Sequence, residues 1–279
     1  MPSSVPATVD EHAEAAVAKA RAARSIGRYL VSSAMAGAYV GLAVVLLIAV
    51  SAPLVAVGNP AAKLVQAAVF GLALTLVVFA GAELFTGNAM VMLQGLLKRT
   101  TSAGDLARVW VLSLVGNLLG SVAIAALVHA GGTLATAKPG APAAGLALLK
   151  SSIAGKNAAS GGQLFARAVL CNMLVCLALW MAARATSDGA KLAVLWWGLL
   201  AFIGAGFEHS IANMTLFSLG IFNHSASVSD LARNLAWTVP GNIVGGGLLV
   251  GIAYWYVASP SRAVLPVQAA APLADRVPA

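Results

Sequence analysis

Residues 81–90 read GAELFTGNAM, and residues 206–217 read GFEHSIANMTLF. Glu83 and Asn88 of the first stretch recur as Glu208 and Asn213 of the second, each 125 positions later. A GN-x-x-G motif repeats at the same distance, at residues 116–120 and 241–245. The chain therefore carries an internal duplication, and each copy places polar residues within a mostly apolar stretch.

The composition indicates a membrane protein. Of the 279 residues, 60% are apolar and only 9% are charged, and the mean hydropathy is +0.88. Soluble domains carry about 25% charged residues. Most of the six apolar segments approach or exceed the ~20 residues that a membrane-spanning helix needs. We predict an all-α integral membrane fold with spans near 31–50, 64–82, 109–130, 164–183, 192–205 and 234–257.

The duplication predicts how the spans are arranged. It divides the chain into two halves of three spans, and an odd number of crossings inserts the second half upside down relative to the first. Two inverted three-helix repeats place a solute pathway near their shared axis, and a polar break repeated in both halves points to the binding site of a channel or transporter. The segment 192–205 is short, which favours a helix interrupted within the membrane.

The distribution of Lys and Arg predicts the orientation of the chain in the membrane and the location of its two terminal segments. With the N-terminus inside, cytoplasmic segments hold 11 Lys and Arg residues and the outer side holds 6, so both termini are expected in the cytoplasm. We predict a cytoplasmic segment at 1–28, a pore domain at 29–258 and a disordered cytoplasmic tail at 259–279. The net charge of +8 follows from this bias and does not indicate nucleic-acid binding.

Glu83 and Glu208 are the two acidic residues expected inside apolar spans; the other seven fall in tails or loops. A carboxylate in mid-membrane is costly unless it has a partner or faces a cavity. Two hypotheses follow. The carboxylates, with Asn88 beside the first, hold the interrupted backbone by accepting from its free N–H groups, or they carry protons.

His209 breaks the symmetry, because its counterpart 125 positions earlier is Leu84. A feature present in one half alone is more specific to function than a shared one, and histidine exchanges protons near neutral pH. We predict that His209 meets a solute in the pore; a buried hydrogen-bonding role is the alternative. Thr86 and Asn172 lie at suitable depth to bond a passing solute or to satisfy the backbone.

Enzyme and cofactor signatures do not appear in the sequence. It contains no G-x-S-x-G elbow, no phosphate-binding glycine loop and no metal-ligand cluster, so we expect no enzyme, no cofactor and no metal. The tripeptide at Asn59, NPA, matches the aquaporin motif but occurs once, ahead of the second span. An aquaporin-type channel for neutral solutes remains an alternative.

Five motifs together resemble the formate/nitrite transporter family. They are SSAMAGAYVGLAV from Ser32, GAELFTGNAM, LCNMLVCLALWMA from Leu170, GFEHSIANMTLF and the GN-x-x-G pairs. They extend over residues 32 to 246, and the combination of ELFTG with GFEHSIANM is highly specific. Within the family the chain is most similar to the nitrite-transporting branch. Formate and hydrosulfide are the alternative solutes.

The resemblance implies an aquaporin-like fold with spans two and five interrupted, assembled as a homopentamer in the lipid of the bacterial inner membrane with one pore in each protomer. His209 would lie at the pore centre, bonded to Thr86 or Asn172, supported by Glu208 and Asn213, and would protonate or electrostatically stabilise the anion. The expected apolar constriction consists of Leu74, Leu84, Phe85, Phe70 and Phe202.

The resemblance also implies an outer lysine that attracts the anion. Lys156, sixteen residues before Asn172, has the expected spacing, and Lys150 is its rival. In the resulting hypothesis this lysine draws in nitrite, and a proton neutralises the anion before it crosses the constriction. The sequence leaves open the preferred anion and whether the protein is a channel or a proton-coupled carrier.

Overall fold

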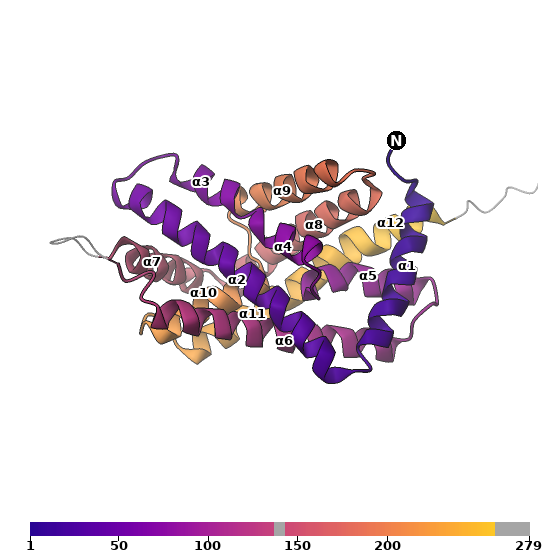
Figure 1. Ribbon diagram of the computed structural model, residues 1–279, viewed down its shortest axis with the longest axis horizontal. Coiled ribbons are helices and arrows are strands. Elements are labelled where there is room, and N and C mark those ends of the chain that lie inside the picture. The colour runs from indigo at the N-terminus through magenta and orange to yellow at the C-terminus, as the bar shows by residue number, and fades with distance from the viewer. Residues whose placement is uncertain (137–142, 260–279) are drawn as a thin grey trace, which may run out of the picture.

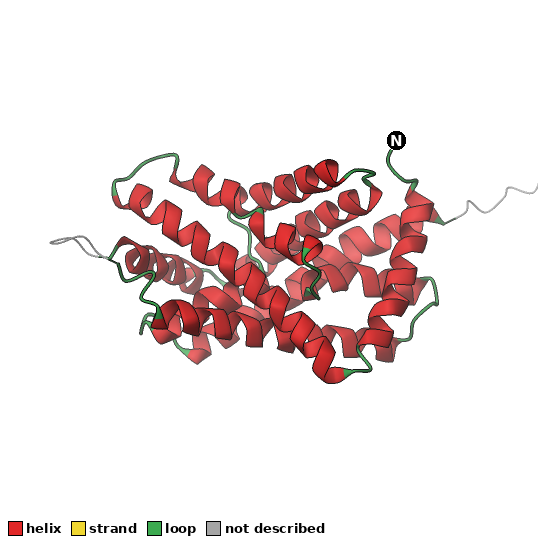
Figure 2. Ribbon diagram, viewed as in Figure 1, coloured by secondary structure: helices red, strands yellow, loops and turns green. Residues whose placement is uncertain are grey.

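The computed structural model describes residues 1–136 and 143–259, and within these ranges every regular element is helical (Figures 1 and 2). The predicted tail 259–279 lies, apart from Ser259, outside the described residues. The helices of the first half are α1 (Val5–Ala22), α2 (Ile26–Ala56), α3 (Ala62–Val69), α4 (Leu72–Phe79), α5 (Phe85–Leu97) and α6 (Ala103–Ala130). Those of the second half are α7 (Ala144–Ala158), α8 (Gly161–Arg184), α9 (Asp188–Ala205), α10 (Ser210–Phe222), α11 (Val228–Ile243), the π-helix η1 (Val244–Ile252) and α12 (Ala253–Ala258).

Six helical stretches in the described part of the chain are long and apolar enough to cross a membrane. They are α2, α3 with α4, α6, α8, α9, and α11 through α12. Each overlaps one predicted span, so the six-span prediction is confirmed, although the helices extend beyond the apolar cores. At the starts of α6, α8 and α11 the extension includes polar first-turn residues: Ser102 with Asp105, Ser160 with Gln163 and Ser227 with Asp230 form reciprocal capping boxes.

Glycines allow the close helix pairs at the centre of the fold. Helix α2 runs along α6, and α8 runs along α11 and η1. A Cβ on Gly120 would collide with the carbonyl of Ala34 in α2, and a Cβ on Gly245 would collide with the carbonyl of Val169 in α8. The two glycines are 125 positions apart, so the duplication repeats the same backbone contact.

Two non-helical segments have equivalent glycines near their starts. Helix α4 ends at Phe79 and α5 starts at Phe85, while α9 ends at Ala205 and α10 starts at Ser210. Gly81 has φ of 78° and Gly206 has φ of 75°, the left-handed conformation that terminates a helix without steric cost when no Cβ is present. These segments contain the duplicated glutamates.

The predicted span at 64–82 contains a turn that the sequence analysis did not anticipate. Helix α3 ends at Val69 and α4 starts at Leu72. The freed carbonyl of Ala68 accepts a 2.7 Å hydrogen bond from the indole N–H of Trp196 in α9, and the same indole fills the space beside Gly71. The turn is therefore stabilised by α9, which is distant in sequence.

The short helices cover the two ends of this core. Helix α1 packs on α5 and α12 at one end of the long axis, and α7 packs against α2 and α10 at the other (Figure 1). The buried face of α1 is made of Val9, Ala13, Ala16 and Ala20. Helix α1 thus docks on α5 and α12 and brings Lys19 to Glu83 in the first break.

Candidate functional site

Two asparagines hold the backbone at the breaks. Asn117 Oδ1 accepts from the Phe85 N–H at 3.0 Å, and its amide donates to the carbonyls of Ser33 and Glu83 at 2.7 and 2.9 Å. Asn242 makes the equivalent set, accepting from the Ser210 N–H at 2.9 Å and donating to the carbonyls of Ala168 and Glu208 at 2.8 and 3.1 Å. One of the two hypotheses in the sequence analysis gave such backbone ties to the glutamates, and the structure shows them at these amides. The repeat distance of 125 was the signal that could have identified them.

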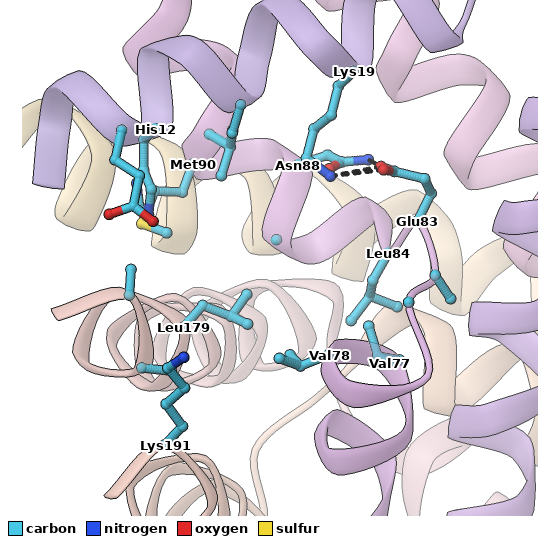
Figure 3. Close-up of a pocket in the computed structure, with 18 of the residues that line it drawn as sticks. His12, Lys19, Val77, Val78, Glu83, Leu84, Asn88, Met90, Leu179 and Lys191 are labelled. Atoms are coloured by element: carbon cyan, nitrogen blue, oxygen red, sulfur yellow. Dashed lines mark hydrogen bonds and ion pairs between the residues drawn. The ribbon is translucent and has the colours of Figure 1, made fainter. Parts of the chain in front are cut away.

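The Glu83 carboxylate is instead the centre of a polar cluster. Lys19 Nζ lies 2.7 and 2.9 Å from its two oxygens, Tyr29 donates at 3.0 Å and Asn88 donates at 3.1 Å. Figure 3 shows Lys19, Asn88 and Glu83 converging from α1, α5 and the break. Lys19 was counted only as a cytoplasmic charge in the sequence analysis, since nothing local pairs it with a residue 64 positions away.

Glu208 is held in a similar way in the second half. Lys156 Nζ and the Asn213 amide each lie 2.7 Å from Glu208 Oε2, and Asn213 also donates to Asn234 Oδ1 at 2.8 Å. The side chain of Glu208 is 4% exposed and that of Lys156 is 20% exposed. Lys150 points elsewhere: it is exposed and lines neither of the cavities described below.

His209 is the N-cap of α10. Its Nδ1 accepts from the Ala212 N–H at 3.2 Å, and its Nε2 lies 3.3 Å from the Thr86 hydroxyl. A nitrogen that accepts a backbone N–H carries no proton, so the proton of the neutral ring belongs on Nε2. The imidazole also stacks on the Phe202 ring at 5.7 Å between centroids. The site therefore presents one ring N–H donor beside one hydroxyl.

Asn172 bonds to the backbone of Thr86 and not to the side chain of His209. Its amide donates to the Thr86 carbonyl at 3.1 Å and to the Asn242 carbonyl at 2.6 Å. Cys176, one turn further along α8, donates a weaker bond to the same Thr86 carbonyl at 3.3 Å. Of the two partners expected for His209, the structure shows Thr86.

Two cavities approach this site from different sides. The Lys19 cavity, about 610 Å³, is lined by Lys19, Val77, Glu83, Leu84 and other residues of α1, α5, α8 and α9 (Figure 3). The Lys156 cavity, about 330 Å³, is lined by Lys156, Phe70, Phe202, Glu208 and His209 with residues of α2, α3, α7 and α10.

An apolar barrier separates the cavities. Phe70 lines the Lys156 cavity and Val77 lines the Lys19 cavity, seven positions further along α3 and α4. Leu74, between them, is 2% exposed and lines neither cavity. The rings of Phe70 and Phe202 meet edge to face at 5.7 Å. Leu84 lines the Lys19 cavity and Phe202 lines the Lys156 cavity, and both belong with Phe70 and Leu74 to one buried apolar cluster.

Phe85 occupies a different place from the one expected. Its ring packs edge to face on Trp110 of α6, with centroids 6.4 Å apart, and it lines neither cavity. The reason is its position at the first turn of α5, where its backbone N–H is tied to Asn117 and its side chain is directed toward α6.

His12, which the sequence analysis set aside as a tail residue, is buried against α5 and α8. Its Nδ1 lies 2.7 Å from Gln94 Oε1, and its ring meets the Trp180 indole edge to face at 5.3 Å. Burial lowers the pKa of the His12 imidazole below its usual value, against the opposing effect of the Gln94 hydrogen bond. His12 lines the Lys19 cavity.

Comparison with known proteins identifies this arrangement. The family model described as formate/nitrite transporter matches residues 6–256, which is nearly all of the described chain. The chain belongs to the formate/nitrite transporter family. It is 41% identical over 259 residues to the nitrite transporter NirC of Salmonella typhimurium, covering 91% of each chain. As a member of this family it is a multi-pass membrane protein and not an enzyme.

Solved structures of the formate/nitrite transporter family have the same fold. The chain superposes on a structure titled "FNT family ion channel" with a TM-score of 0.82, at 41% identity over 91% of this chain and 99% of that one. A second, titled "Pentameric formate channel with formate bound", gives a TM-score of 0.71 at 28% identity over 84% and 98% of the two chains. The family resemblance seen in the motifs is confirmed.

Proposed function

We propose that the chain transports a small monovalent anion, with nitrite as its main solute, through one pore in each protomer. The observation that carries the proposal is the row formed by the Lys156 cavity, the His209–Thr86 pair, the apolar barrier and the Lys19 cavity. The relatives named as nitrite transporters support nitrite as the solute, and the neighbour with bound formate supports formate as the alternative.

His209 is proposed to stabilise the anion with its Nε2–H. To give up a proton near neutral pH the ring would first have to be an imidazolium, with a proton on Nδ1 as well as on Nε2, but Nδ1 already accepts from the Ala212 N–H. The hydrogen bond from Nε2 needs no such second proton, so we favour stabilisation by a neutral donor over direct protonation by the ring. The anion then takes a proton from hydronium in the cavity, leaving a water molecule, and crosses Leu74 and Phe202 as the neutral acid, which avoids most of the cost of dehydrating a charge.

The arrangement of the spans is part of the proposal. We infer two inverted three-helix repeats, with the second and fifth spans interrupted inside the membrane at 80–84 and 206–209. The equivalent asparagine ties at positions 117 and 242 and the equivalent glycines at 81 and 206 support this inference. The exposed apolar side chains around the outside of the helices suit lipid and neighbouring protomers, and the pentameric neighbour supports a homopentamer.

The excess of Lys and Arg on one side supports cytoplasmic termini, and the bacterial relatives support a location in a bacterial inner membrane. In this orientation the Lys19 cavity faces the cytoplasm and the Lys156 cavity faces outward. The proposed division of the chain keeps residues 1–28 as a cytoplasmic segment and residues 29–258 as the pore. Glu83 and Glu208, each held by a lysine and an asparagine, are assigned to the scaffold rather than to proton transfer.

Reconstitution in proteoliposomes tests the function. We expect nitrite influx that exceeds formate influx and rises with an inward proton gradient. His209→Leu should reduce nitrite flux by at least about tenfold, since a hydrogen bond to a charged group contributes roughly 1.5–3 kcal/mol. His209→Asn, which keeps an N–H donor but does not titrate near neutral pH, should retain flux and its stimulation by the gradient.

Two results would contradict parts of this proposal. Loss of gradient stimulation in His209→Asn, with flux retained, would make the ring the proton donor. Osmotic swelling with a neutral solute and no anion flux would favour a neutral-solute channel. His129→Asn is the matched control, because His129 lies outside both large cavities and pairs with Asn223.

A further inference from the structure

The Lys156 cavity carries more positive charge than Lys156 alone supplies. Its charged lining residues are Lys63, Lys156, Arg167 and Glu208, three cations and one carboxylate, a net charge of +2. Lys156 and Glu208 form a 2.7 Å ion pair, so they balance each other. The excess therefore comes from Lys63 and Arg167.

The Lys19 cavity has no such excess. Its charged lining residues are Glu11, Lys19, Glu83 and Lys191, and their charges cancel. Figure 3 shows Lys19 and Glu83 on one wall and Lys191 across the cavity from them. The two approaches to the barrier thus differ by two charges, although the duplicated glutamate is paired with a lysine on both sides.

Lys63 and Arg167 are available for a ligand. Within residues 1–136 and 143–259, neither side chain forms an ion pair or a hydrogen bond. Lys63 is exposed in the first turn of α3, and Arg167 is half-buried in α8. The Arg167 carbonyl accepts from the Glu208 N–H at 3.3 Å, which fixes the arginine beside the second break.

We propose that Lys63 and Arg167 form a collecting site for small monovalent anions at the mouth of the Lys156 cavity, and that Lys156 serves mainly to neutralise Glu208. The inference rests on the proposed function and reassigns the attracting role expected of Lys156. A cleft of one charge sign with low-dielectric walls raises local counter-ion concentration and on-rates by roughly 10- to 1,000-fold. Such a site selects by charge, so nitrite and formate would be collected alike.

The test is nitrite influx into proteoliposomes, measured against nitrite concentration and ionic strength. For the double variant Lys63→Gln with Arg167→Gln we expect KM to rise about tenfold at low salt while the maximal rate changes by less than about twofold. Raising the salt should increase KM in the wild type but little in the double variant, because exposed charges are screened within about 8 Å at 0.15 M. Lys63→Glu should raise KM further than Lys63→Gln.

Lys150→Gln is the matched control. It removes one positive charge, as Lys63→Gln does, but Lys150 is exposed in α7 and lies outside the cavity lining, so the KM and salt dependence of this variant should match the wild type. Each variant is first checked for a wild-type oligomer peak by size exclusion. If the double variant fails this check, Lys63→Gln alone carries the test because Lys63 is at the surface.

A wild-type KM and salt dependence in the Gln variants, with normal nitrite flux in the wild type, would overturn the collecting site and leave the proposed function intact. An equal rise of KM in Lys150→Gln would also overturn it, since the effect would then be a general surface charge. Absence of anion flux through the wild type would remove the proposed function and this inference together.

Discussion

Asn242→Ala should destabilise the protein through the second break. The substitution removes an acceptor from the Ser210 N–H and two donors from the carbonyls of Ala168 and Glu208, all at a buried side chain. A buried group left without a partner costs about 1–3 kcal/mol, and a carbonyl with a second lone pair falls at the low end. We expect a loss of about 3–5 kcal/mol. Asn242→Asp keeps the acceptor but sets a buried carboxyl group against the carbonyls of Ala168 and Glu208, so it should not restore the stability.

Thermal unfolding of the purified protein in detergent, followed by intrinsic fluorescence, measures the effect. A loss of this size corresponds to a fall in Tm on the order of 10 °C. Asn117→Ala removes the equivalent three bonds and should match it. Asn59→Ala is the control, because Asn59 is exposed and its one bond, at 2.9 Å, closes a local turn. A Tm for Asn242→Ala equal to that of Asn59→Ala would refute the assignment of Asn242 as the tie.

Three further predictions concern the neighbouring contacts. Lys156→Met leaves the buried Glu208 without its cation and should lower the free energy of unfolding by about 3–5 kcal/mol. Adding Glu208→Gln to this variant should recover part of the loss. Additive Tm changes in this double-mutant cycle would contradict the pairing. Thr86→Val removes the hydroxyl 3.3 Å from His209 Nε2 and should lower nitrite flux by about fivefold, the equivalent of one hydrogen bond. Thr86→Ser keeps a hydroxyl and should retain the flux. Equal flux in the two variants would show that the Thr86 hydroxyl does not act on the anion. Because the pKa of His12 is lower in the folded chain, His12 of the unfolded chain takes up a proton at a higher pH than His12 of the folded chain. The buried neutral imidazole therefore contributes fully to stability above about pH 6.5, and this contribution is lost as the pH falls below that value. The Tm of His12→Gln should therefore depend less on pH between 7 and 5 than that of the wild type, and parallel curves would contradict the assignment.

Much of the architecture could be predicted because its causes are local. Runs of apolar residues predict spans from their own composition, and the left-handed glycines at 81 and 206 lie where the apolar runs give way to polar residues. His209 as an N-cap is also a local feature, because its partner Ala212 is three positions away. Features that depend on a few consecutive residues are within reach of sequence reasoning.

The partners of the buried polar groups were not within reach. Lys19 meets Glu83 across 64 positions and Lys156 meets Glu208 across 52, so each pair depends on how separate helices dock. The turn between α3 and α4 is another example, because it is closed by Trp196 from a helix 128 positions away. The displacement of Phe85 from the expected constriction has the same origin, since the direction of its side chain follows from the packing of α5 on α6.

By itself the sequence determined a six-span membrane protein with a duplicated polar break and an unmatched histidine, because hydropathy, repeat distance and local helix signals are carried by neighbouring residues. Only the tertiary structure decided which asparagines tie the breaks, that Lys156 is bound to Glu208, and that Lys63 and Arg167 are left to face the cavity. Those outcomes depend on helix packing, since burial obliges each polar group to find a partner and the packed neighbours decide which partner is within hydrogen-bonding distance.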